Sequence, residues 1–349
     1  MRAKIFSSLY RLTRYVITNI LYFFQKLFFL PTNLEPAVRF GDRMLGSFYF
    51  FKKIIFDFPL PKNSNVHIFD LEFPSPIIGS SFKSDKKILE MWLRMGIGGI
   101  IFKTIMSEKR LGNSKPRLQD IKINNEKGLF NSLGLPGPGL DEFIHNLNNS
   151  ELWSFNRPIG ISIGGESENE YLNNIKTINT TLDDKFKSYF FELNISCPNT
   201  ETGQVICENP EQLDSLLKKI RIFISKPISV KISPDVNDNI LADIGQLCSE
   251  YDSIIINAGN THYKSREELG FDEKSFSMQG GGVSGPSIFY RTLSMVEIFS
   301  KFNSPIMATG GISNIEHINT LKNAGASLFG MATNLVLDPY CIPILNEKV

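Results

Sequence analysis

The stretch FFELNISCPNT, residues 190–200, passes from apolar to polar within a few positions. Its beginning, preceded by Tyr189, is an apolar run through Leu193 that predicts a buried strand. Asparagines, Cys197 and the stiff Pro198 turn follow at once, so amide donors and acceptors lie beside a thiol. We interpret this stretch as a strand end that carries chemistry.

Seven further short apolar runs flank this strand, separated by longer helical or loop segments. Such alternation is typical of repeated βα units. The eight predicted strands are Pro76–Gly79, Gly98–Lys103, Pro158–Ile163, Tyr189–Leu193, Ile228–Ile232, Ser253–Ile256, Pro305–Ala308 and Ser327–Gly330. Eight units predict an α/β fold, the (β/α)8 TIM barrel, whose functional residues follow the carboxyl ends of the strands.

Length and composition leave room for this barrel together with an extension. The chain has 349 residues, 42% of them hydrophobic, and 26 glycines. One α/β domain of roughly 250–300 residues accounts for most of that length. We expect residues 57–349 to form the catalytic barrel and residues 1–56 to form a helical extension.

Charge and cysteine usage argue against two other kinds of protein. Lysine and arginine number 37 against 36 aspartates and glutamates, a net charge of +1, which gives little support to nucleic-acid binding. The four cysteines are widely spaced and include no C-x-x-C pair. This spacing indicates neither a zinc site nor an iron–sulfur cluster, so we expect no metal.

The N-terminal segment from residue 11 to residue 30 has the pattern of an amphipathic helix. One stripe is apolar and the other mostly polar. The apolar stripe comprises Leu12, Val16, Ile20, Phe23 and Leu27, and the other Arg11, Arg14, Tyr15, Thr18, Tyr22, Gln25 and Lys26. The least polar run is shorter than the ~20 residues of a spanning helix, so a helix lying in the membrane interface fits best. A spanning helix, a cleaved signal and a plain core helix are the alternatives.

A second helical pattern follows, with aromatic and aliphatic residues on one face from Phe40 to Ile55. We expect the two aromatic-rich faces to meet. They would form either a hairpin packed on the domain or an apolar entrance for a lipid-soluble molecule.

Two features inside the barrel pattern suit a bound anion. Lys231 lies within a strand otherwise built for burial, and a buried lysine is costly unless it faces an anion or acceptor. Three glycine-rich segments, residues 280–285, 309–313 and 330–334, come late in the chain. Glycine lets backbone amides approach an anion closely, and the loops after strands seven and eight are the usual phosphate site of barrels.

Several ordered motifs resemble those of dihydroorotate dehydrogenases, flavin enzymes of pyrimidine biosynthesis. They are residues 190–200, the run GNSKPR at 112–117, the run NSLGLPGPG at 131–139 and the three glycine segments. The resemblance covers about residues 34–345. It implies oxidation of dihydroorotate to orotate through flavin mononucleotide (FMN), with a base taking the C5 proton while hydride leaves C6.

The resemblance also implies a role for individual residues. The base would be Cys197, because a thiol supplies some thiolate at neutral pH. The substrate would be held by Lys83, Asn131, Asn194, Asn199 and Asn257. FMN would be held by Ser80, Lys83, Thr104, Asn194, Lys231, Gly282, Gly285, Gly310, Gly311 and Thr333. After Asn257 the family has Ser or Thr where this chain has Ala258, so Asn260 and Thr261 could take that place in a shifted alignment.

The motifs combine features of two classes of the family. Cys197 and the 131–139 loop resemble the soluble class, whereas the N-terminal helices and residues 230–235 resemble the membrane-associated, quinone-using class. By the extension we expect a quinone as electron acceptor, with fumarate or NAD through a partner subunit as alternatives. We expect peripheral association with a membrane: the cytoplasmic face of the inner membrane, or the mitochondrial inner membrane in a eukaryote. Two alternative hypotheses remain: a related flavin barrel that acts on another pyrimidine-like substrate, and a binding protein without catalytic activity.

Overall fold

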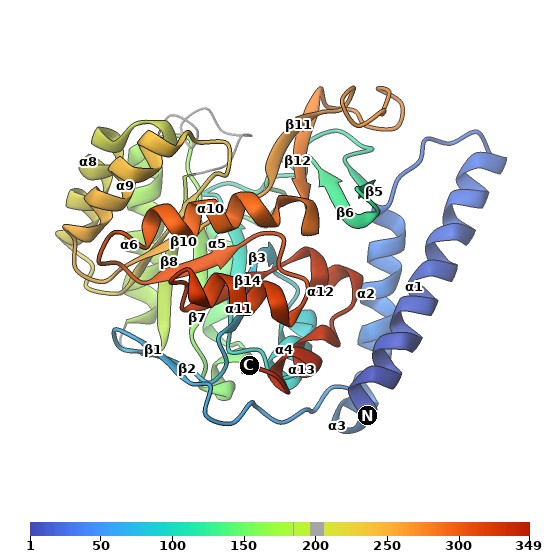
Figure 1. Ribbon diagram of the computed structural model, residues 1–349, viewed down its shortest axis with the longest axis horizontal. Coiled ribbons are helices and arrows are strands. Elements are labelled where there is room, and N and C mark those ends of the chain that lie inside the picture. The colour runs from blue at the N-terminus through green and yellow to red at the C-terminus, as the bar shows by residue number, and fades with distance from the viewer. Residues whose placement is uncertain (184, 196–205) are drawn as a thin grey trace.

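The computed structural model describes residues 1–183, 185–195 and 206–349, and its centre is a closed barrel of eight parallel strands (Figure 1). The predicted TIM barrel is therefore confirmed. In their order around the barrel the strands are β10 (Ile254–Ala258), β13 (Ile306–Thr309), β14 (Leu328–Met331), β3 (Ile77–Lys83), β4 (Gly99–Ile105), β7 (Ile159–Ile163), β8 (Tyr189–Asn194) and β9 (Ile228–Ile232). Each overlaps one of the eight apolar runs.

Helices surround the barrel and bury the outward residues of its strands. Those described are α4 (Lys86–Arg94), α5 (Leu140–Asn148), α6 (Glu168–Leu182), α8 (Pro210–Arg221), α9 (Asp238–Ser249), α10 (Phe289–Phe299), α11 (Ile315–Asn323), α12 (Thr333–Leu337) and α13 (Cys341–Asn346), with short 3-10 turns η2 (Glu151–Phe155) and η3 (Pro286–Ile288). Five helices begin where a side chain accepts a hydrogen bond from the first turn. These caps are Asp85, Ser167, Asn209, Asn237 and Asn314.

The inward side chains change from apolar to polar along the strands. Near the amino ends, an apolar cluster packs on the hairpin of β1 (Val66–Ile68) and β2 (Leu71–Phe73), and it includes Ile78, Phe190, Ile255 and Met307. Because strand side chains alternate, the residue two positions later points inward as well. Those residues are Ser80, Glu192, Asn257 and Thr309, all polar and all buried. The interior of the barrel therefore has an apolar layer near the amino ends of the strands and a polar layer of side chains nearer their carboxyl ends.

A second sheet lies over one side of the barrel top (Figure 1). It is antiparallel, with strand order β11-β12-β6-β5. Its strands are β5 (Leu118–Ile123), β6 (Glu126–Asn131), β11 (His262–Ser265) and β12 (Gly280–Ser284). In the β6–β12 pairing Gly282 stands opposite Asn131, which brings a predicted phosphate segment beside a predicted substrate residue.

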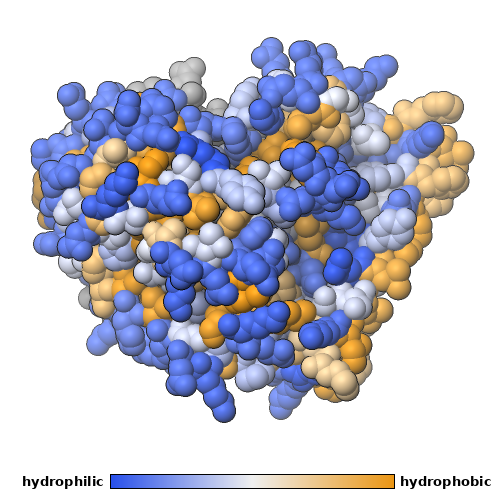
Figure 2. Space-filling view, viewed as in Figure 1, coloured by the Kyte–Doolittle hydropathy of each residue, from blue (hydrophilic) through white to orange (hydrophobic). Residues whose placement is uncertain are grey.

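The extension consists of α1 (Arg2–Leu27), α2 (Glu35–Ser47), η1 (Phe48–Phe51) and α3 (Lys52–Ile55). In the described chain no helix has the length and apolar character needed to cross a membrane. The orientation of α1 is unusual for a surface helix. Thr18 and Gln25 of its polar stripe are buried, whereas Leu12, Val16, Ile20, Phe23 and Leu27 are 44–63% exposed. Figure 2 shows this apolar surface running along the edge of the molecule formed by α1.

Ion pairs fasten the extension to the barrel, among them Lys115 with Glu35 at 3.4 Å. Arg14 of α1 lies 2.7 Å from Asp120 of β5, and Glu35 of α2 lies 2.7 Å from Arg117. Asp42, also of α2, lies 2.5 Å from Lys83 at the end of β3. Burial raises the pKa of Glu35, but hydrogen bonds and charges from Arg117 and Lys115 outweigh it, and the net pKa is lowered. The carboxylate therefore stays ionised, and α2 is anchored by a buried charge pair.

Candidate functional site

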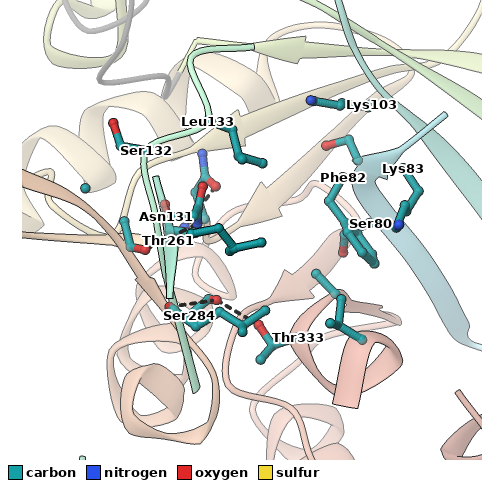
Figure 3. Close-up of a pocket in the computed structure, with 18 of the residues that line it drawn as sticks. Ser80, Phe82, Lys83, Lys103, Asn131, Ser132, Leu133, Thr261, Ser284 and Thr333 are labelled. Carbon is teal, nitrogen blue, oxygen red and sulfur yellow. Dashed lines mark hydrogen bonds between the residues drawn. The ribbon is translucent and has the colours of Figure 1, made fainter. Parts of the chain in front are cut away.

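A cavity of about 830 Å³ opens at the carboxyl ends of the barrel strands. The strand ends, the second sheet and α2 contribute its walls. In Figure 3, Asn131 and Thr261 lie on one wall and Lys83, Lys103 and Ser80 on another. Eleven predicted site residues line it, namely Ser80, Lys83, Thr104, Asn131, Asn194, Lys231, Gly282, Gly285, Gly310, Gly311 and Thr333. Residues spread over more than 250 positions of sequence thus converge on one space.

Three predicted residues are not among those that line the cavity. Cys197 and Asn199 lie outside the described residues. Asn257 is fully buried beneath the cavity, and its side-chain amide donates to Glu192 Oε2 at 2.8 Å. Its strand runs on to Ala258, so the Asn257 side chain points into the barrel floor instead of following the strand end. Asn260 and Thr261 line the cavity in its place.

Asn194 is held by a chain of hydrogen bonds at the end of β8. Its side-chain amide donates to Thr104 Oγ1 at 2.8 Å, and Thr104 Oγ1 lies 3.0 Å from Ser162 Oγ. The Tyr171 hydroxyl donates to the Asn194 carbonyl oxygen at 3.0 Å. These contacts fix both the backbone and the side chain, so the amide is preorganised toward the cavity.

Lys231 is buried, as the sequence pattern indicates, and its partner is a hydroxyl. Its Nζ donates to Ser81 Oγ at 3.0 Å, and Ser81 Oγ donates to Glu192 Oε1 at 2.6 Å. Glu192 also accepts from Asn257, so a continuous network joins strands β3, β8, β9 and β10. A buried carboxylate thus stands one hydroxyl away from a buried ammonium, which lowers the cost of burying both charges.

The sequence motifs did not identify Ser81, Glu192, Lys103 or Asp42 as site residues. A glutamate within the apolar run of residues 189–193 is a usable signal, because an unpaired buried carboxylate is costly. Lys103 follows the apolar residues of its strand, and its ammonium donates to the Pro136 carbonyl at 2.8 Å. Asp42 gives no local signal, because it reaches the site only through the packing of α2.

The glycine loops after the late strands have backbone conformations that other residues rarely adopt. Gly310 and Gly311, directly after β13, have φ values of +128° and +72°. A Cβ on Gly311 would lie 2.5 Å from the Phe289 backbone, so only glycine fits there. Next to these loops Thr333 Oγ1 donates to Ser284 Oγ at 2.8 Å (Figure 3). Close backbone and paired hydroxyls are suitable for binding a phosphate.

The cavity wall also has polar atoms that suit a bound polar group. Ser80 Oγ and Thr309 Oγ1 are buried and, among the described residues, have no hydrogen-bond partner. Both residues line the cavity. Buried hydroxyls normally have partners, so a ligand with hydrogen-bonding atoms bound here would satisfy them. Together with the ammonium of Lys231 and the glycine loops, this donor set fits a phosphorylated flavin.

The described cysteines are poor candidates for a base. Burial raises the pKa of the Cys207 and Cys248 thiols to about 12, and burial also raises the pKa of Cys341. Such thiols remain protonated at neutral pH. The structure therefore supplies no competitor to Cys197 among the cysteines that it describes.

Comparison with known proteins gives a consistent picture. Residues 64–348 match the family model described as dihydroorotate dehydrogenase. The NAD(+)-type dihydroorotate dehydrogenase B catalytic subunits of Malacoplasma penetrans (strain HF-2) and Bacillus cereus (strain G9842) are 28% and 30% identical, and the alignments cover 82% and 80% of this chain and 92% and 88% of those proteins. A putative dihydroorotate dehydrogenase A (fumarate) of Aquifex aeolicus (strain VF5) is 27% identical over 79% of this chain and 88% of its own length.

A solved structure shares the fold. It is the crystal structure of DHODH in complex with ferulenol from Eimeria tenella, with a TM-score of 0.74, 20% identity and coverage of 90% of each chain. The family match begins just before the β1–β2 hairpin and runs through the whole barrel. On these grounds the chain belongs to the dihydroorotate dehydrogenase family.

Proposed function

We propose that this chain binds FMN in the 830 Å³ cavity, oxidises dihydroorotate to orotate there, and passes the electrons to a quinone at a membrane surface. The observation that carries the proposal is the convergence of Lys83, Asn131, Asn194 and Lys231 with the glycine loops on one cavity. Membership of the dihydroorotate dehydrogenase family supports the proposed cofactor, because enzymes of this family use FMN.

Different parts of the cavity suit different parts of the cofactor. The backbone of Gly310 and Gly311 and the hydroxyl of Thr333 would hold the phosphate. Lys231, Asn194 and Thr104 would hold the ring, since each is buried and brings a polar side-chain group to the lining of the cavity. When bound, FMN supplies an acceptor for the hydride that leaves the substrate. The buried ammonium of Lys231 would stabilise negative charge that develops above it.

The remaining polar groups suit a flat anionic substrate rich in amides. Lys83 would balance the carboxylate of dihydroorotate, and Asn131, Asn194 and Asn199 would pair with the ring amides. Asn131 is already oriented, because its side-chain amide donates to the Gly282 carbonyl at 3.3 Å. Cys197 would take the C5 proton as a thiolate, and its electron pair would form the new S–H bond.

The extension supports a quinone as the acceptor. The family model begins at residue 64, after the extension, so the family match itself does not include these helices. The apolar face of α1 points away from the barrel, and basic residues such as Arg11 stand beside it. A helix with this distribution suits the interface of a membrane, where lipid-soluble quinones reside.

We expect Leu12→Glu/Ile20→Glu to abolish binding to anionic phospholipid vesicles and to lower turnover with a long-chain quinone in those vesicles at least tenfold. Two charges on the exposed face would oppose insertion of α1. Flavin reduction by dihydroorotate should be unchanged, because neither residue lines the cavity. Vesicle co-sedimentation and quinone-dependent orotate formation measure the two effects.

Ile222→Glu/Tyr290→Glu is the matched control. These residues are 83% and 79% exposed and lie on or beside the outer helices of the barrel, so the same number of charges is added elsewhere. The control should bind vesicles like the unmodified protein. Equal vesicle binding and equal quinone turnover by all three proteins would contradict the proposed membrane association and quinone acceptor. If the unmodified protein turned over with fumarate or NAD but not with quinone, that compound would be the electron acceptor instead.

A further inference from the structure

Lys83 is bound by a carboxylate from the extension. Its Nζ lies 2.5 Å from Asp42 Oδ2, and the two side chains are 17% and 32% exposed. Asp42 belongs to α2, whereas Lys83 ends the barrel strand β3. Both residues line the main cavity, and Figure 3 shows Lys83 on its wall.

The same pair stands between the main cavity and the packing of the extension. A second, smaller cavity of about 60 Å³ lies among α1, α2, α4 and α12. Four residues line both cavities, namely Val38, Asp42, Lys83 and Val336. A ligand that binds the Lys83 ammonium therefore also weakens the Lys83–Asp42 ion pair that holds α2 against the barrel.

The carboxylate of Asp42, in the wall of the main cavity, faces Lys83, the residue proposed to bind the substrate carboxylate. Among the residues that the structure describes, the acidic ones that line the main cavity are Glu35 and Asp42. Glu35 is paired with the buried Arg117 at 2.7 Å, which fixes the barrel loops rather than a ligand. Asp42 presents to Lys83 the same chemical group, with the same charge, as the carboxylate of dihydroorotate or orotate.

We propose that Asp42 determines the affinity of the site for carboxylate-bearing pyrimidines by competing with them for Lys83. The inference rests on the proposed function, in which Lys83 binds the substrate carboxylate. Binding a carboxylate ligand weakens the Asp42 contact, and because coupling is reciprocal, loosening α2 strengthens ligand binding. The expected size is about fivefold in the dissociation constant, as for a partly exposed ion pair.

Titration of orotate into the FMN-loaded protein, followed by the change in flavin absorbance, tests this. Asp42→Asn should bind orotate about fivefold more tightly than the unmodified protein, and added salt should shrink the difference. The neutral carboxamide analogue of orotate should bind both proteins equally, because it has no charge to compete with. Asp42→Ser, which also removes the charge, should shift orotate affinity in the same direction.

Asp120→Asn is the matched control, because it removes the charge from another partly exposed ion pair between the extension and the barrel. The Arg14–Asp120 distance is 2.7 Å and the side chains are 19% and 29% exposed, but Asp120 does not line the cavity. This variant should bind orotate like the unmodified protein. Unchanged or weaker orotate binding in both Asp42 variants, or an equal gain in Asp120→Asn, would overturn the proposal.

The same titration separates this inference from the proposed function. An unmodified protein that binds FMN but no orotate would overturn the assigned substrate, and with it the role of Asp42. If the unmodified protein and Asp42→Asn bind orotate with the same affinity, the competing role of Asp42 is overturned and the proposed substrate stands.

Discussion

Lys231→Met is expected to slow reduction of bound FMN by dihydroorotate about 100-fold, the loss typical of one preorganised polar group at a reacting centre. Lys231 is buried, and its ammonium is positioned by Ser81, which Glu192 positions in turn. Methionine keeps the length and apolar stem of the side chain while removing its charge. Stopped-flow absorbance, expressed per bound flavin, separates this effect from any loss of cofactor.

Lys226→Met is the control for this prediction. Lys226 precedes the other end of the same strand, where it is partly buried over the Tyr189 ring and 3.5 Å from Asp183. Its substitution removes an equal charge far from the cavity, so the flavin should be reduced at the normal rate. Equal reduction rates in Lys231→Met and the unmodified protein would remove Lys231 from the reaction.

Cys197→Ala is expected to slow the same step by about 10²–10⁴-fold, the usual contribution of a general base. Cys197→Ser should retain more activity, with a rate that rises toward higher pH. The sign follows from the protonation state: the base works deprotonated, a thiol ionises near pH 8.5, and a hydroxyl ionises far less readily. The pH profile of flavin reduction therefore moves upward in the serine variant.

Cys207→Ala provides the comparison. Burial raises the pKa of the Cys207 thiol to about 12, so it is protonated at neutral pH and cannot act as the base. Its removal should leave the pH profile unchanged. A Cys197→Ala protein that reduces its flavin at the normal rate would show that another group takes the proton.

The barrel could be predicted because its strands are continuous apolar runs buried by helices outside and by one another inside. The second sheet could not. Residues 280–284 suggested a phosphate loop by their glycines, yet they form β12 and pair with β6, far away in sequence. Strand pairing over such separations depends on tertiary context that no local pattern contains.

Residues that line the cavity were predicted from sequence where a motif lies at a strand end, and were missed where helix packing brings them to the cavity. Asn257 shows how a small boundary error matters: the predicted strand ends at Ile256, whereas β10 runs to Ala258 and keeps Asn257 inside the barrel. The pattern of α1 was predicted, but which stripe faces the barrel depends on partners such as Asp120 for Arg14. Asp42 enters the site through helix packing alone.

We propose above all that this cavity holds FMN and that dihydroorotate reduces the bound flavin. Anaerobic addition of dihydroorotate to the purified, FMN-loaded protein tests it most directly, with flavin absorbance and orotate formation followed together. We expect a yellow protein that is bleached, with one orotate formed per flavin reduced. A yellow protein that dihydroorotate leaves unchanged would rule out the assigned substrate, and a protein that does not bind FMN would rule out both the cofactor and the reaction proposed for this cavity.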